Sequence, residues 1–152
     1  MKGPDCLNDY SISMPAYSIG KGIYSKIGEV CSPYGKRAVA VGGKNAIAAI
    51  KPVLMAEIEK TNIEITDFLW YGGEAAYENV DYLMNEEAFK KADMIFAIGG
   101  GKALDTGKCL GVKTKKPVFT FPTIASTCAA CTSVSIMYNK DGTFKGPFFF
   151  NA

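Results

Sequence analysis

The sequence predicts an α/β fold: a parallel sheet with flanking helices, to which an amino-terminal edge strand and a carboxyl-terminal β-hairpin are added. From about residue 36 onward, short β-branched apolar runs alternate with longer segments of helical period, which is the pattern of βαβ units. Several of these apolar runs end directly in glycines, as strands do when they turn into a helix. The 152 residues suffice for one domain with one core.

The first half of the chain supplies two strand-helix units. Asn45 is the expected N-cap of the first helix. Pro52 falls inside that helix, so a kink or a break is expected near Ile50. The expected elements are a strand over 37–43, a helix over 46–60, a strand over 64–71 and a helix over 78–92.

The second half continues the alternation and ends in a hairpin. The expected elements are a strand over 94–98, a helix over 102–112, a strand over 118–121, a helix starting within 123–133, and two strands over 134–138 and 144–150. Asp141-Gly142 suits a type I′ turn between the last two. At the other end, residues 11–19 are expected to form an edge strand that leads through Gly20 and Gly22 into a short helix.

Composition excludes several classes of protein. Lys and Arg number 17 against 15 Asp and Glu, an excess too small for sequence-independent nucleic-acid binding. No apolar run is long enough to span a membrane, and the first ten residues contain no apolar core of a signal peptide. Five cysteines, an odd number, argue against a disulfide scaffold and for a reducing, cytoplasmic location.

Three consecutive glycines, Gly99, Gly100 and Gly101, join a buried strand to the next helix. Backbone without Cβ atoms can approach a bulky anion, and a helix N-terminus adds free N–H groups and the positive end of its dipole. A pyrophosphate fits such a site; the alternative is that the glycines only make a tight turn. Gly101 and Gly107 are one residue too far apart for a P-loop, and Leu104 replaces the third glycine of the common dinucleotide fingerprint.

Hydroxyl side chains follow the next strand, and we expect them at the same end of the sheet as the glycines. There they can bind phosphate, ribose or carboxamide groups; the alternative is that they cap a helix and satisfy turn backbone. They are Thr123, Ser126, Thr127, Thr132 and Ser133.

Cys128 and Cys131 form a C-x-x-C pair in the same stretch. A thiol redox or zinc module is therefore an alternative function, although a structural zinc site needs four ligands and the chain has no histidine and no second C-x-x-C.

The segments GGGKALDTGK and PVFTFPTIASTCAACTSVSIMYNKDG resemble the amino-terminal domain of glycerol dehydrogenases and hydroxycarboxylate dehydrogenases, in the iron-containing (metal-dependent) alcohol dehydrogenase superfamily. The resemblance covers essentially the whole chain and is strongest, around TCAACTSVSIMYN, with the hydroxycarboxylate branch. It implies a Rossmann-like domain that binds NAD or NADP, and an oxidoreductase that transfers hydride to or from a small polyol or a 2-hydroxy or 2-oxo acid. A noncatalytic nucleotide-binding module is the alternative.

The resemblance also implies roles for individual residues. Gly99, Gly100 and Gly101 would hold the pyrophosphate, and Asp105 would order their loop. The residues expected to contact the adenosine side are Thr123 and Ser126, and those expected to flank the nicotinamide are Thr132, Val134 and Tyr138.

Two positions depart from the glycerol dehydrogenase pattern. Cys128 stands where those enzymes carry a substrate-binding aspartate, which weakens the glycerol assignment. Gly43 and Lys44 stand where they carry an acid, and since such an acid binds the ribose 2′-hydroxyl and repels a 2′-phosphate, Lys44 predicts that NADP binds at least as well as NAD.

The family binds its divalent metal, zinc or iron, through an Asp and two His residues of a helical carboxyl-terminal domain. Residues 1–152 contain no histidine, so we expect this chain to be the NAD(P)-binding amino-terminal part of a two-domain, homo-oligomeric enzyme and to be inactive alone. The phenylalanines Phe148, Phe149 and Phe150 are expected to pack against the missing part.

Overall fold

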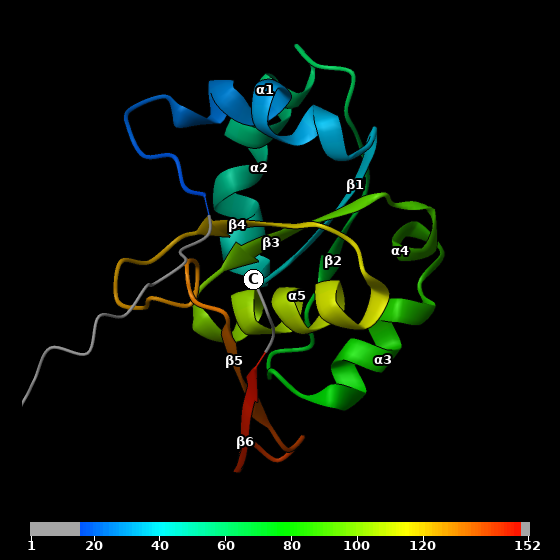
Figure 1. Cartoon of the computed structure of the whole chain (residues 1–152), viewed down its shortest axis with the longest axis vertical. Helices are drawn as coiled ribbons and strands as arrows, with labels where there is room; N and C mark the ends of the chain where they lie inside the picture. Colours follow the sequence, from blue (N-terminus) through cyan, green and yellow to red (C-terminus); the bar gives the residue numbers. More distant parts are fainter. Residues whose placement is uncertain (1–15, 150–152) are drawn as a thin grey trace, which may run out of the picture.

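A parallel sheet of four strands lies between two layers of helices in the computed structural model, which describes residues 16–149 (Figure 1). The order of the strands is β2-β1-β3-β4. Their bounds are Arg37–Gly42 for β1, Glu64–Trp70 for β2, Met94–Gly99 for β3 and Val118–Pro122 for β4. All three strand pairs are parallel, so the predicted α/β class is confirmed.

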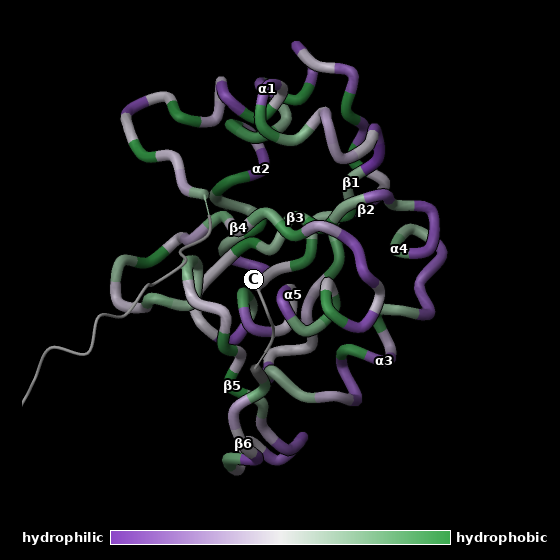
Figure 2. Tube along the Cα trace, viewed as in Figure 1, coloured by the Kyte–Doolittle hydropathy of each residue, from purple (hydrophilic) through white to green (hydrophobic). Residues whose placement is uncertain are grey.

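Alternating side chains of the strands fill two apolar cores, one on each face of the sheet. Ala40, Phe96 and Ile98 belong to the core that also contains buried residues of α1 (Ile27–Cys31) and α2 (Lys44–Ile58). Val41 and Ile95 belong to the core under α3 (Tyr77–Asn85), α4 (Glu87–Lys91) and α5 (Gly101–Thr114). Because strands buried on both faces need apolar side chains in both directions, they read as continuous apolar runs. Figure 2 shows this apolar colour along β3 and polar residues around α3 and α4.

The chain reverses its direction of travel across the sheet at β1. From β1 it passes through α2 to β2 on one side, and then through α3 and α4 to β3 on the other side of β1. The carboxyl ends of β1 and β3 therefore form the topological switch point of the sheet, where open α/β sheets have a crevice.

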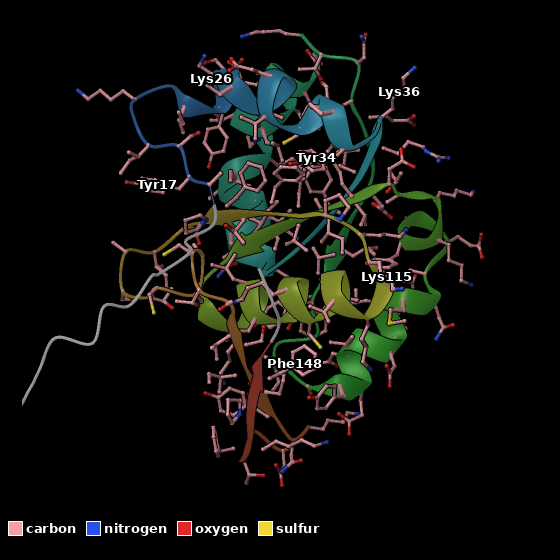
Figure 3. The ribbon with its side chains drawn as sticks, in the orientation of Figure 1. Tyr17, Lys26, Tyr34, Lys36, Lys115 and Phe148 are labelled. Atoms are coloured by element: carbon pink, nitrogen blue, oxygen red, sulfur yellow. The ribbon has the colours of Figure 1, made fainter. Side chains whose placement is uncertain are left out.

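A separate antiparallel hairpin, β5 (Val134–Tyr138) and β6 (Phe144–Phe149), packs against α5. Met137 is buried and Phe148 is half-buried against the core that contains Leu110, and Figure 3 shows Phe148 beside α5. The side chain of Phe149 and the whole of Phe150 lie outside the described residues. Phe148 thus packs within this chain.

The turn of the hairpin differs from the predicted type I′ form. Within the described residues the only non-glycine with positive φ is Lys115, whereas Gly142 has a φ of +84°. A type I′ turn needs positive φ at both central residues, so Asp141 cannot be one of them. Its carboxylate instead accepts hydrogen bonds from the Thr143 amide (2.9 Å) and hydroxyl (2.6 Å), which favours a longer loop that ends in the glycine.

Three expectations about helices differ from the structure. Helix α2 begins after Gly43, so Asn45 lies inside it, and it has no break at Pro52; a kink near Ile50, the other form of that expectation, stays a prediction. The helix over 78–92 is two helices, because Glu86 has extended backbone (ψ 134°). On a continuous helix Leu83 and Phe89 would lie about 120° apart, and the break lets both side chains reach the core, where each is nearly inaccessible to solvent.

Residues 123–133 form turns and bends instead of the predicted helix. At the amino-terminal end, residues 16–22 contain no strand, and the remainder of the expected edge strand lies outside the described residues. The short helix after Gly22 is present as the 3-10 helix η1 (Ile23–Lys26) followed by α1, and a further turn, η2 (Ser32–Tyr34), leads into β1. Across residues 16–149, none of the helices has the length and apolar character that crossing a membrane requires.

Candidate functional site

A cavity of about 250 Å³ lies at the topological switch point, between the carboxyl ends of β1 and β3. The two strands meet closely here, since the Gly43 amide donates a hydrogen bond of 3.4 Å to the carbonyl of Ile98. The residues that line the cavity are Gly43, Ala46, Tyr71, Gly99, Gly100, Gly101, Lys102 and Ala103. The three glycines singled out in the sequence are therefore brought together in one concave site.

The glycine loop leaves the first amides of α5 without an intrahelical or capping partner. The N-cap residue is Gly100, it provides no side-chain cap, and the first turn carries no acidic residue. The first hydrogen bond of the helix runs from the Leu104 amide to the Gly100 carbonyl at 3.0 Å. The amides that precede Leu104 thus belong to a helix N-terminus that borders the cavity, where free N–H groups and the helix dipole favour an anion.

Two glycines fix the position of this helix end. Gly99 has a φ of +140°, and a Cβ there would lie 3.0 Å from the Cβ of Ala103. Further along α5, a Cβ on Gly107 would clash with the side chain of Ala97 in β3. Because α5 can approach β3 this closely, its N-terminus stays directly beyond the end of that strand.

Lys102 and Tyr71 bring polar groups to the rim of the cavity. The Nζ of Lys102 lies 2.7 Å from Oε2 of Glu74, and this hydrogen bond raises the pKa of the ammonium. The same Nζ is 5.0 Å from the ring centroid of Tyr138. The hydroxyl of Tyr71 donates to the carbonyl of Gly73 at 2.9 Å. Lys102 therefore connects the glycine loop with β5, which carries Tyr138.

The predicted hydroxyl residues follow β4 beside the glycine loop. The Thr123 amide donates to the Gly99 carbonyl at 3.1 Å, and a Cβ on Gly101 would lie 3.4 Å from Oγ1 of Thr127. Thr127 also accepts a hydrogen bond from the Ala129 amide at 3.1 Å. Thr123 and Ser126 are exposed, so their side chains are accessible to a ligand.

Thr132, Val134 and Tyr138 lie on the segment that enters and forms β5, and Asp105 contacts this segment. Oδ2 of Asp105 accepts the amide of Ile136 at 3.1 Å, and Oδ1 lies 2.8 Å from Nζ of Lys108. These contacts fasten β5 to α5. These contacts of Asp105 are with β5 and Lys108, and its expected part in ordering the glycine loop stays a prediction.

Lys44 and Cys128 are not among the residues that line the cavity. Lys44 is the first residue of α2, directly after Gly43, and its Nζ lies 4.4 Å from the ring centroid of Trp70. Cys128 is an exposed free thiol. The Cys131 thiol donates to the carbonyl of Cys128 at 3.5 Å.

Sequence reasoning missed Tyr71, Ala46, Lys102 and Lys108 as site residues. Lys102 directly follows the glycines and Lys108 repeats the helical spacing from Asp105, so both had a signal in the sequence. Tyr71 reaches the cavity only because β2 lies beside β1, which no local pattern shows.

A second, larger cavity of about 1120 Å³ runs along the outer edge of β4. Its walls include Tyr17, Tyr34 and Phe119, of which Tyr17 and Tyr34 are labelled in Figure 3. Among residues 16–149, no group of three or more His, Cys, Asp or Glu side chains is placed to hold a metal ion. The described part of the chain thus contains no cluster of side chains that fits a metal ion.

Comparisons with known proteins show which family this chain is similar to. A profile described as iron-containing alcohol dehydrogenase matches residues 15–151. The glycerol dehydrogenase of Thermotoga maritima is 35% identical over 144 residues, which are 88% of this chain and 36% of that protein. Hydroxycarboxylate dehydrogenase A of Escherichia coli K12 is 34% identical over 106 residues, covering 70% of this chain and 28% of the relative.

Among solved structures, the glycerol dehydrogenase of Schizosaccharomyces pombe matches with a TM-score of 0.73 and 24% identity, over 85% of this chain and 32% of that one. This likeness shows the fold. The chain spans little more than a third of the length of the Escherichia coli and Thermotoga maritima glycerol dehydrogenases. Since the profile covers nearly all of its residues, the chain belongs to the iron-containing alcohol dehydrogenase family.

Proposed function

We propose that this chain is the NAD(P)-binding domain of a metal-dependent oxidoreductase and that the cavity at Gly99–Gly101 holds the cofactor pyrophosphate. One observation carries the proposal: an uncapped N-terminus of a 14-residue helix borders a cavity lined by glycines at the topological switch point. Such a site offers amides and a positive dipole to a group of two linked phosphates, with no Cβ in the way.

The family resemblance assigns residues to the two ends of the cofactor. Thr123 and Ser126, exposed after β4, would contact the adenosine side. Thr132, Val134 and Tyr138 would flank the nicotinamide, and the position of Tyr138 near Lys102, which lines the cavity, supports this assignment. The chain's own residues would then bind and orient the cofactor, which supplies the hydride chemistry when it is bound.

The proposed reaction is hydride transfer between this cofactor and a small polyol or a 2-hydroxy or 2-oxo acid, in the complete enzyme. The names of the relatives, glycerol dehydrogenase and hydroxycarboxylate dehydrogenase A, support that substrate class. Cys128 would face the substrate. The complete enzyme is proposed to be a cytoplasmic homo-oligomer.

A charge placed at the helix N-terminus tests the pyrophosphate site. Gly101→Asp puts a carboxylate at the first position of α5, where it favours the helix by about 0.3–1 kcal/mol but repels phosphate. We expect the affinity for ADP, measured by calorimetry, to fall about tenfold or more while thermal stability is kept or raised.

Gly101→Ala is the matched control, because its Cβ would meet only Thr127 Oγ1 at an ordinary 3.4 Å. It adds no charge and should weaken ADP binding much less than Gly101→Asp. If Gly101→Asp and the unsubstituted chain bind ADP equally well, the pyrophosphate is not at this helix.

The chain alone should not turn over substrate. It has no histidine, and we found no fitting metal site in residues 16–149, so no step of the reaction is assigned to a metal held here. Incubation with glycerol or 2-hydroxybutyrate, NAD or NADP, and Zn²⁺ or Fe²⁺ should form no reduced cofactor by absorbance. Oxidation that a chelator abolishes would contradict this.

A further inference from the structure

We infer that Lys108 and Asp105 are positioning residues that hold the nicotinamide side of the cofactor site at a fixed place along α5. The inference rests on the proposed function and deepens it. Both side chains are almost fully buried, with 6% and 9% of their surface exposed. They lie one helical turn apart on α5, the helix whose first residues border the cavity.

The buried pair contacts the segment before and within β5 at every second residue. Nζ of Lys108 donates to the carbonyl of Thr132 at 3.3 Å and to the carbonyl of Val134. Oδ2 of Asp105 accepts the amide of Ile136 at 3.1 Å. Two side chains of one helix therefore bind the backbone at three positions of this segment: residues 132, 134 and 136.

These contacts take the place of a neighbouring strand. Among the described residues β5 pairs with β6 alone, apart from a bridge between Ala76 and Tyr138. Backbone groups on the other edge of a buried strand need partners. The ammonium and the carboxylate supply a donor and an acceptor there, so they set the register of β5 against α5.

A contribution to folding stability does not by itself explain why Asp105 and Lys108 form a buried ion pair. Desolvation of two charges offsets most of their attraction, and apolar replacements of similar volume are often neutral or stabilising. The hairpin already has apolar contacts with α5 through Met137 and Phe148. The specific result of the pair is that Thr132 and Val134 are held at a fixed position relative to Gly101.

One rigid helix therefore sets the distance between the two halves of the cofactor site. Gly101 opens α5 at the pyrophosphate end, and Lys108 follows seven residues later, about 10 Å along the axis. A shift of β5 should change how the nicotinamide is held and leave the phosphate end unchanged. NADH and ADP separate these effects, since ADP has the pyrophosphate but no nicotinamide.

The test compares both ligands on one set of variants. In the double variant Asp105→Asn/Lys108→Met, which removes both charges together, and in Lys108→Met, the affinity for NADH should fall by about tenfold, the usual effect of losing charged hydrogen bonds. The affinity of these variants for ADP should stay within about twofold of that of the unsubstituted chain. Lys113→Met is the matched control. Lys113 lies on the same helix as Lys108, and its loss breaks an ion pair of 2.8 Å with Asp81 of α3 at exposed surface, which should change neither affinity.

A measurement on the unsubstituted chain keeps the test decisive if the variants do not fold. The amide resonances of residues 132–138 should shift with NADH and stay in place with ADP. Equal losses for both ligands, no loss of NADH affinity, or identical shifts with both ligands would overturn the positioning role. If the unsubstituted chain binds neither ligand, the proposed function itself fails.

Discussion

At the scale of a single residue, we predict that Lys44 influences which of the two nicotinamide cofactors the proposed site favours. It is exposed at the start of α2, and its Nζ lies 4.4 Å from the Trp70 ring centroid. An ammonium there attracts the 2′-phosphate of NADPH, whereas NADH has no charge at that position. We predict that NADPH binds at least as tightly as NADH, and that Lys44→Ala weakens NADPH binding about three- to tenfold by loss of a charged contact with little effect on NADH.

Lys51→Ala provides the matched control for this titration. Lys51 lies on the same helix, and its Nζ is also 4.4 Å from an aromatic ring centroid, that of Phe68. Removing it should change the affinity for neither cofactor, and added salt should reduce the preference for NADPH. Tenfold tighter binding of NADH than of NADPH by the unsubstituted chain would refute the role of Lys44.

Residues that act locally could be predicted from the sequence, and those that act across the fold could not. Gly99–Gly101 line the cavity as expected, because a glycine run after a buried strand has a local cause. The role of Lys108 depends on contacts with residues 24 and 26 positions away. Spacing alone shows that Lys108 and Asp105 share a helix face, without showing that the face packs against β5.

At the scale of elements, Asp93 joins the starts of the two central strands. Its carboxylate accepts hydrogen bonds of 3.0 Å from the amides of Lys36 and Arg37, and the Arg37 guanidinium lies 2.8 Å from Oδ1. These groups, the guanidinium first, lower the pKa of Asp93 to about 2. Since the folded pKa is below the ordinary value, the stabilisation is complete above about pH 4 and is lost as pH falls towards 2.

We predict that Asp93→Asn lowers the free energy of unfolding at pH 7 by about 1 kcal/mol, measured by urea denaturation. The difference from the unsubstituted chain should narrow between pH 4 and pH 2. Glu29→Gln, which removes an exposed pair with Lys26, should leave the free energy of unfolding unchanged within error. A difference for Asp93→Asn that stays constant with pH would contradict the assigned pKa.

The elements that the sequence predicts incorrectly are helices in which tertiary packing determines where the helix continues and where it breaks. Burial of Ile50, Leu54 and Ile58 against the sheet holds α2 together through Pro52. The break at Glu86 brings Phe89 into the core. By contrast, the four strands of the sheet match their expected ranges to within two residues. In the central strands β1 and β3, burial on both faces produces apolar runs that the local sequence displays directly.

At the scale of the whole molecule, the site exists because of strand order. In the order β2-β1-β3-β4, β1 and β3 are neighbours, which places the end of β1, with Gly43 and Lys44, beside the glycine loop after β3. Sequence patterns predicted parallel strands but not their order, because no local pattern shows which strands are neighbours in the sheet. The position of Tyr71 on the cavity and the edge position of β4 follow from that order.

The most direct test of the pyrophosphate site is a titration of the isotope-labelled chain with ADP, followed through its backbone amide resonances. We expect saturable shifts that are largest at Gly43 and at Gly99–Ala103, which are among the residues that line the smaller cavity. Saturable shifts confined to the cavity along β4, or no saturation at ADP concentrations above about 1 mM, where even weak specific sites fill, would contradict this expectation.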